Sequence, residues 1–370
     1  MCDNKGVEKR DRAFLRRCAQ LADLADSRVL DNPRVGAVLV YDGRIIGEGY
    51  HQRAGQAHAE VNCLASVQPT DRNLIPEATL YISLEPCYIT GRTGACVDVI
   101  RRERIRTVVF AQRDTTEGAG GNSVAILRDA GVTVREYPDF VPTLAPNAHR
   151  RVFTQKGRPF VLLKWAQSSD GFLRPADRRK TYWITNPISR RLVHRWRAKT
   201  SAIIVGARTV IEDNPSLTTR LFPGPNARPV VLDLRNRCTG KEGLFQGVGE
   251  LPLVFTNRSR PDIAAEVIVL DETDVVAALP KILAALHKRN YGQVTVEGGA
   301  VVLAAFIQAG LWDEARIFTG ATYFGNGLLA PSLPSNSSML TQRKIDADLL
   351  SIWARPDSTE LSEVQVQGEV

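Results

Sequence analysis

The amino-acid sequence predicts two α/β domains, one following the other. At 370 residues the chain exceeds the usual size of a single hydrophobic core. Helical and strand patterns alternate in two separate stretches. Prolines recur in the irregular segment between them, residues 138–158, where only 149–153 could form a short helix. We expect a first domain at 8–145, a linker at 146–157, a second domain at 158–355 and a polar tail at 356–370.

The first half begins with a helix and a hairpin, after which helices and strands alternate. Apolar residues recur at helical spacing over residues 10–27. Asp42-Gly43 separates two short apolar runs, 35–40 and 44–49, and is typical of a tight hairpin turn. Further strands are predicted at 78–83, 106–111 and 132–134, and helices at 57–67, 96–104 and 123–130. This order indicates a layered α/β sandwich.

The second half shows a similar alternation. Asn186-Pro187 reads as an N-cap followed by proline at the first helical position, which predicts a helix over 187–199. In the helix expected at 275–287, Pro280 marks either the first turn or a kink. A last helix is expected from Gly298-Gly299 to about residue 309. Strands are predicted at 159–166, 202–205, 230–234, 253–255, 267–270, 293–297 and 315–318.

The composition is that of a soluble globular protein, with 44% hydrophobic and 24% charged residues. The chain has no apolar run of about 18 residues, and its charged start does not resemble a secretory signal, so we expect a cytoplasmic protein without membrane contact. A net charge of +8 suits either a nucleic-acid binder or an enzyme with phosphorylated ligands. No basic surface with interleaved aromatic residues is evident, which argues against nucleic acid.

A metal-binding pattern lies in the first half. His58 and Glu60 open one predicted helix, Cys87 follows Pro86 after a strand, and Cys96 opens another helix. A histidine and two thiolates supply the three protein ligands of a catalytic zinc, which leaves one position open for water. Glu60 lies close enough to move a proton without ligating the metal. Together these residues form the signature of zinc-dependent deaminases. We interpret Cys63, five residues past His58, as a small core residue.

The spacing of the two cysteines identifies a closer relative. Eight residues separate them, where most deaminases of this pattern have two. With the segments 32–36, 47–51 and 84–87, this arrangement closely resembles the RibD family of bifunctional riboflavin biosynthesis enzymes. That family deaminates 2,5-diamino-6-(5-phosphoribosylamino)pyrimidin-4-one and then reduces its ribosyl group to ribityl. The resemblance implies that His58, Cys87 and Cys96 hold zinc, that Glu60 is the proton shuttle, and that Asn32, His51 and Arg92 contact the pyrimidine or the ribose phosphate.

The loop between the cysteines departs from the family pattern. Tyr88-Ile89 stands where the family has a small residue and a substrate-contacting histidine, and Gly94-Ala95 replaces two prolines. The segment 114–118 also lacks the usual Asp-Pro-x-Pro. An alternative is therefore a diverged paralogue that deaminates a related aminopyrimidine or purine-like ring, with one half inactive.

The second half carries weaker signals of its own. Gly298-Gly299 could let a phosphate approach a helix N-terminus, although it is not the G-x-G-x-x-G fingerprint. Arginine side chains such as those of Arg197 and Arg220 suit phosphate binding. The segments 163–171, 183–185, 205–209 and 213–218 are similar to successive motifs of the RibD reductase domain.

The resemblance implies a cytidine-deaminase-like α/β/α sandwich followed by a dihydrofolate-reductase-like domain that uses NADPH. It also implies a homo-oligomer. Asp213 is our candidate for proton assistance, with capping or turn formation as the alternative role. The resemblance places the cofactor on Gln167, Trp183, Thr209, Asp213, Gly298 and Gly299. It places the ribosyl phosphate on Thr181, Arg197, Leu217, Arg220 and Glu297.

Overall fold

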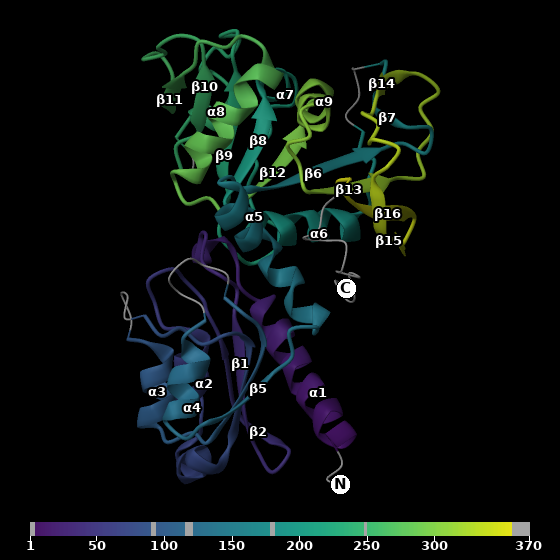
Figure 1. Ribbon diagram of the computed structural model, residues 1–370. Coiled ribbons are helices and arrows are strands. Elements are labelled where there is room, and N and C mark those ends of the chain that lie inside the picture. Colours follow the sequence, from purple (N-terminus) through teal and green to yellow (C-terminus); the bar gives the residue numbers. More distant parts are fainter. Residues whose placement is uncertain (1–3, 90–93, 115–120, 178–181, 248–249, 357–370) are drawn as a thin grey trace. The chain divides into compact units, whose positions relative to one another are not determined.

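The computed structural model describes residues 4–356, apart from 90–93, 115–120, 178–181 and 248–249 (Figure 1). The described chain forms two compact units, with the boundary between Thr154 and Gln155. The segment 138–158, expected to be irregular except for a short helix at 149–153, is largely helical. It contains two short 3-10 turns, Val141–Thr143 and Ala145–Asn147, and the helix α5 (Ala148–Lys156).

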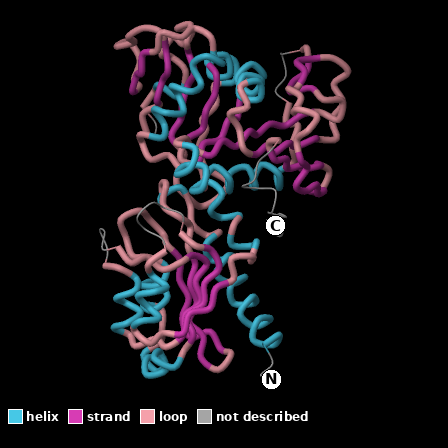
Figure 2. Tube along the Cα trace, in the orientation of Figure 1, coloured by secondary structure: helices cyan, strands magenta, loops and turns pink. Residues whose placement is uncertain are grey.

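The first unit is an α/β/α sandwich around a sheet of strand order β2-β1-β3-β4-β5. Figure 2 shows the strands between α1 and the other helices. Alternate strand residues face opposite ways, so Val38 and Tyr81 pack against α1 while Leu39 and Leu80 pack against α2, α3 and α4. The elements are α1 (Asn4–Ala22), η1 (Ser27–Val29), β1 (Gly36–Tyr41), β2 (Arg44–Tyr50), α2 (Ala59–Ala65), η2 (Pro69–Glu77), β3 (Thr79–Leu84), α3 (Cys96–Arg102), β4 (Thr107–Gln112), α4 (Ser123–Asp129) and β5 (Thr133–Glu136).

The predicted hairpin turn is confirmed. Tyr41 pairs with Arg44, and the two residues between them, Asp42 and Gly43, have φ of 46° and 76°. Two successive positive φ values are the requirement of a two-residue type I′ turn, which explains the Asp-Gly pair. Cys63 is fully buried in the core beneath this sheet, as expected.

The second unit is built on a sheet of order β11-β10-β9-β8-β12-β6-β13-β16-β15. Neighbours from β11 to β13 run parallel, whereas β16 and β15 are antiparallel additions at the edge. The strands are β6 (Phe160–Gln167), β7 (Phe172–Pro175), β8 (Ala202–Gly206), β9 (Arg228–Asp233), β10 (Leu253–Thr256), β11 (Glu266–Val269), β12 (Gln293–Gly298), β13 (Glu314–Thr319), β14 (Gly327–Leu329), β15 (Ser338–Ile345) and β16 (Asp348–Ala354). The pair β7 and β14 forms a small separate sheet, and the sequence indicated neither it nor β15 and β16.

Helices cover both faces of the large sheet. Side chains of α8 and α9 pack on one face, while those of α6 and α7 pack on the other. The helices are α6 (Pro187–Ala198), α7 (Ala207–Asp213), the short η5 (Gly243–Phe245), α8 (Val275–His287) and α9 (Ala300–Gln308). Asn186 caps α6 as predicted, because its Oδ1 accepts a hydrogen bond of 2.9 Å from the Ser189 amide. Of the helices that the structure describes, none is long and apolar enough to cross a membrane.

Candidate functional sites

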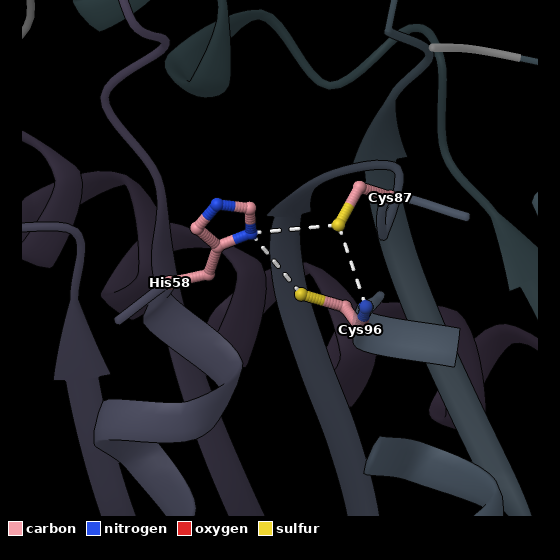
Figure 3. Close-up of side chains that lie close together, drawn as sticks. All are labelled: His58, Cys87 and Cys96. Carbon is pink, nitrogen blue, oxygen red and sulfur yellow. Dashed lines mark hydrogen bonds between the residues drawn. The ribbon is translucent and has the colours of Figure 1, made fainter. Parts of the chain in front are cut away.

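His58, Cys87 and Cys96 converge at the carboxyl end of β3 (Figure 3). His58 is the N-cap residue of α2, Cys87 follows β3, and Cys96 is the first residue of α3. The His58 Nδ1 atom lies 3.3 Å from the Cys96 Sγ and 3.4 Å from the Cys87 Sγ, and all three ligand atoms lie within 4.8 Å of one another. Tetrahedral zinc with ordinary bond lengths would separate such atoms by about 3.6 Å. The three side chains therefore fit a zinc ion.

Hydrogen bonds within the cluster favour the thiolate form of Cys87. Its thiol has a pKa lowered to about 4, because the Cys96 thiol and then His58 donate hydrogen bonds to it. The Cys96 amide, at the start of α3, donates a further bond of 3.4 Å. The hydrogen bond to Cys87, followed by burial, raises the pKa of the Cys96 thiol. The hydrogen bond to Cys87 also raises the pKa of His58. A thiolate among such donors is a ready metal ligand.

Glu60 lies in the first turn of α2, beside the cluster. Only 3% of the residue is exposed, and its carboxyl group interacts with the Cys96 side chain. Burial, followed by the negative charge of Cys87, raises the pKa of Glu60. A raised pKa makes a carboxylate a better proton acceptor, which suits a general acid–base group.

Asn32 and His51 form a hydrogen-bonded chain that ends at the cluster. The His51 Nδ1 lies 3.1 Å from the Ala57 carbonyl oxygen and must donate to it, so the Nε2 accepts from the Asn32 amide at 3.1 Å. Burial lowers the pKa of His51, in keeping with this neutral tautomer. Its ring meets that of His58 edge-on, with 5.5 Å between centroids. Arg92 lies outside the described residues.

In the second unit, Thr209 and the Gly298-Gly299 turn come together. β8 and β12 are parallel neighbours, so the helices that follow them begin at the same edge of the sheet. A Cβ atom on Gly298 would lie 3.1 Å from Thr209 Cγ2, and one on Gly299 would lie 3.2 Å from Thr209 Oγ1. Gly299 also has a φ of 67°, which disfavours any side chain. This close approach of backbone and hydroxyl suits a phosphate group.

Arg197, Glu297 and Lys164 form a buried ion cluster at the same edge of the sheet. Arg197 donates two hydrogen bonds to the Glu297 carboxylate, of 2.8 and 2.7 Å, and Lys164 Nζ lies 4.0 Å from it. Only 7% of the Glu297 side chain is exposed. Burial would raise the pKa of Glu297, but the two cations outweigh it and lower that pKa to about 2. The sequence analysis gave Lys164 no role, although this residue lies within the segment 163–171, which is similar to a motif of the RibD reductase domain.

The loop after α7 brings Leu217 and Arg220 close to this cluster. Leu217 is 4% exposed and has a φ of 50°. Arg220 is exposed, and its Nη1 donates to Ser216 Oγ at 2.9 Å. Asp213 is the last residue of α7, and burial and then Glu212 raise its pKa. The C-cap of that helix is the next residue, with left-handed backbone, so Asp213 is not itself the cap.

Gln167 and Trp183 lie near the carboxyl end of β6. Gln167 accepts a hydrogen bond of 2.9 Å from Trp165 Nε1 and donates to Thr319 Oγ1 at 3.4 Å. Trp183 is 63% exposed, with the Arg190 guanidinium 4.5 Å from its ring centroid. A broad exposed aromatic face at this edge can stack on a planar ring. Thr181 lies outside the described residues.

Comparisons with known proteins match both units. A family model described as RibD C-terminal domain matches residues 159–357. A second, the cytidine and deoxycytidylate deaminase zinc-binding region, matches residues 8–112. The riboflavin biosynthesis protein RibD of Aquifex aeolicus is 32% identical over 330 residues, which cover 87% of this chain and 90% of the relative.

The chain belongs to the RibD family.

Other members agree along most of the chain. The RibD of Escherichia coli is 31% identical, with 85% of this chain and 89% of that protein covered. A solved Thermotoga maritima structure has a TM-score of 0.84 at 33% identity, covering 94% of this chain and 99% of that one. It is described as a diaminohydroxyphosphoribosylaminopyrimidine deaminase/5-amino-6-(5-phosphoribosylamino)uracil reductase. The Acinetobacter baumannii RibD has a TM-score of 0.79 at 28% identity.

Membership of the RibD family confirms the predicted fold and general function. The first unit is a cytidine-deaminase-like, zinc-binding domain, and the second is the reductase domain of the RibD family. The chain is a bifunctional enzyme of riboflavin biosynthesis. These matches therefore support the interpretation as a bifunctional RibD enzyme over the alternative of a diverged paralogue.

Two departures from the RibD pattern can be placed in the structure. Tyr88 packs against the core of the first unit, whereas the Ile89 that follows it is 44% exposed. At the other departure, the Asp114 amide donates a hydrogen bond to Glu85, which is 3.3 Å away. Tyr88-Ile89 therefore follows the carboxyl end of β3, and Asp114 follows the carboxyl end of β4, near the metal ligands.

Sequence reasoning missed the role of Glu85 in this deaminase domain. The residue is 4% exposed, and its carboxylate also accepts hydrogen bonds from the Gly121 amide at 3.0 Å and the Ser123 hydroxyl at 2.5 Å. It thus joins the end of β3 to the start of α4. The Leu-Glu-Pro-Cys motif was the available signal, but motif membership does not say what a side chain contacts.

Proposed function

We propose that the first unit deaminates 2,5-diamino-6-(5-phosphoribosylamino)pyrimidin-4-one and that the second reduces the ribosyl group of the product to ribityl. The observation that carries the deaminase assignment is the convergence of His58, Cys87 and Cys96 with the buried Glu60. In the second unit, the support is the grouping of Thr209, the Gly-Gly turn and the Arg197 cluster at one edge of the sheet.

The deaminase residues divide the work as follows. Bound by His58 and the two cysteines, zinc would supply a Lewis acid that activates water at neutral pH. Glu60 takes a proton from the attacking water and passes it to the amine, which leaves as ammonia while the ring carbon gains oxygen. Its raised pKa suits both transfers. Asn32, oriented by His51, holds the pyrimidine through the free part of its amide.

The reductase residues position substrate and cofactor. NADPH would supply the hydride, which adds to ribose C1 of the ring-opened imine while a proton goes to the nitrogen. Gly298-Gly299, Thr209, Gln167 and Trp183 bind the cofactor. In our proposal Arg220 and Arg197 face the phosphate, with Leu217 and Glu297 lining the ribosyl site. Asp213 assists the proton transfer, which its raised pKa and its place at the end of α7 support.

The decisive experiment supplies the diaminopyrimidine ribotide to the purified protein, with and without NADPH. We expect exchange of an amino group for oxygen without NADPH, and a further gain of two hydrogens with it, both read by mass spectrometry. A protein that turns over only another heterocycle would overturn the proposed substrate.

A variant tests the role of Glu60 directly. E60Q keeps the shape of the side chain but removes its ability to carry the proton, so we expect ammonia release to stop while metal analysis still finds zinc. The matched control is E77Q, which makes the same change at an exposed glutamate of the same unit. Retained deamination by E60Q would refute the assigned role.

A further inference from the structure

The loop 214–220, between α7 and β9, holds an irregular shape. Asn214 and Leu217 both have positive φ, 41° and 50°, which costs non-glycine residues free energy. A conformation of this kind persists only where surrounding groups hold it. Because the loop carries Leu217 and Arg220, whatever holds it also sets the position of two residues that we assign to the ribosyl phosphate.

Two side chains of α6 hold the backbone of this loop. Arg197 Nη1 donates a hydrogen bond of 3.0 Å to the Thr218 carbonyl oxygen. His194 Nδ1 accepts one of 3.1 Å from the Arg220 amide. The two side chains are three residues apart, so they lie on the same face of the helix. Since Arg197 also binds Glu297, this face of α6 joins the loop to the end of β12.

His194 is suited to be a permanent acceptor. A backbone amide can only donate, so Nδ1 must be unprotonated and the ring neutral. The residue is 4% exposed. Burial, followed by the positive charges of Arg197 and Arg220, lowers the pKa of His194 to about 4. The ring is therefore a neutral acceptor at neutral pH.

We propose that His194 is a positioning residue of the reductase, which holds the Arg220 backbone so that Arg220 and Leu217 meet the phosphorylated ribose. The proposal rests on the proposed function of the second unit. It assigns His194 no contact with substrate or cofactor. Loss of the acceptor should therefore weaken substrate binding and leave the binding of NADPH unchanged.

The test compares H194L with H194N, using 5-amino-6-(5-phosphoribosylamino)uracil and NADPH with the full chain. Leucine removes the acceptor, and loss of the bond that holds the Arg220 amide should raise KM for the ribotide by about tenfold or more. Asparagine offers a carbonyl oxygen near the Nδ1 position, so H194N should stay within about threefold of the native KM. Neither variant should change KM for NADPH, and H194N should keep the native pH profile. The control H287L changes a histidine at the end of α8 and should change neither KM.

Hydrogen exchange gives a readout that does not depend on activity. The Arg220 amide should exchange slowly in the native protein and in H194N, and faster in H194L. If native protein does not reduce the ribotide, the proposed function fails, while the exchange data still decide whether His194 holds the loop. Should H194L not fold, H194Q, whose acceptor is displaced by one methylene, takes its place and should show the raised KM.

Four outcomes would overturn the proposal. An unchanged ribotide KM in H194L would show that the bond does not position the loop. Equal impairment of H194N and H194L would show that the acceptor is not what matters. A parallel rise in KM for NADPH would indicate general loosening of the unit. A loss of kcat in H194N at native KM would make His194 a catalytic residue instead.

Discussion

Replacing Arg197 by methionine should strongly destabilise the second unit, because it leaves Glu297 buried without its main partner. The guanidinium makes bonds of 2.8 and 2.7 Å to the Glu297 carboxylate and one of 3.0 Å to the Thr218 carbonyl. The Arg197 and Glu297 side chains are only 13% and 7% exposed. Water therefore cannot take over these bonds without rearrangement of the cluster.

The magnitude follows from the burial. Removing one partner of a buried ion pair costs about 3–5 kcal/mol. Lys164 remains 4.0 Å from Glu297 and compensates in part, so we expect the lower end, about 3 kcal/mol. For a unit of this size each kcal/mol lowers Tm by about 2–4 °C, which gives a decrease of about 6–12 °C.

The effect should depend on pH in a defined direction. In the folded protein the pKa of Glu297 is lowered to about 2 from its ordinary 4.5. A lowered carboxyl pKa stabilises the fold above the unfolded value, and this contribution is lost as pH falls from about 4.5 towards 2. R197M lacks the part of that contribution that Arg197 supplies, while Lys164 keeps its own. The difference in Tm between native protein and R197M should therefore shrink as pH falls below about 4.5.

Differential scanning calorimetry of the full chain measures these changes. The matched control is R208M, which breaks an exposed pair of 2.8 Å with Glu212 and should change stability by no more than about 0.5 kcal/mol. In an E297Q background the R197M cost should fall, because no buried charge is left unpaired. If the two substitutions are additive within about 0.5 kcal/mol, or R197M behaves like R208M, the reasoning is refuted.

Two further predictions concern the first unit. G36A should lower Tm, because its Cβ would lie 2.1 Å from the Cys18 carbonyl oxygen of α1 and overpacking costs about 1–3 kcal/mol or more. The control is G94A, whose Cβ would meet nothing within 4 Å. An equal Tm for the two variants would contradict the packing of α1 against Gly36. Removal of zinc by a chelator should abolish ammonia release but leave NADPH-dependent reduction of the deaminated ribotide unchanged. The reason is that the described metal ligands all belong to the first unit. Loss of both activities on chelation would contradict this separation.

Most regular elements could be predicted from the sequence, because local chemistry specifies them. The Asp42-Gly43 turn and the Asn186 cap are set by the conformations and bonds of the residues themselves. The strands β15 and β16 were missed for the opposite reason. β15 runs Ser-Met-Leu-Thr-Gln-Arg-Lys-Ile with little buried surface, so it lacks the alternation that marks a strand, and pairing with β16 makes it one.

The sequence indicated only a short helix at 149–153, whereas α5 extends over Ala148–Lys156, because the prolines of this segment favoured an irregular linker. Pro138, Pro142 and Pro146 all precede the helix, which begins at Ala148. Proline is tolerated before and at the start of a helix, so these residues mark where the helix can begin rather than rule it out.

The sequence by itself determined the chemistry of the deaminase, because His58, Glu60, Cys87 and Cys96 form a pattern whose ligand types and order are specific to it. It did not reveal the contacts that organise the reductase. Arg197 and Glu297 are 100 residues apart, and His194 is 26 residues from Arg220. Such pairs have no local signature, since they exist only where parallel strands bring their carboxyl ends to one edge and α6 packs beside them. That proximity is a property of the tertiary structure.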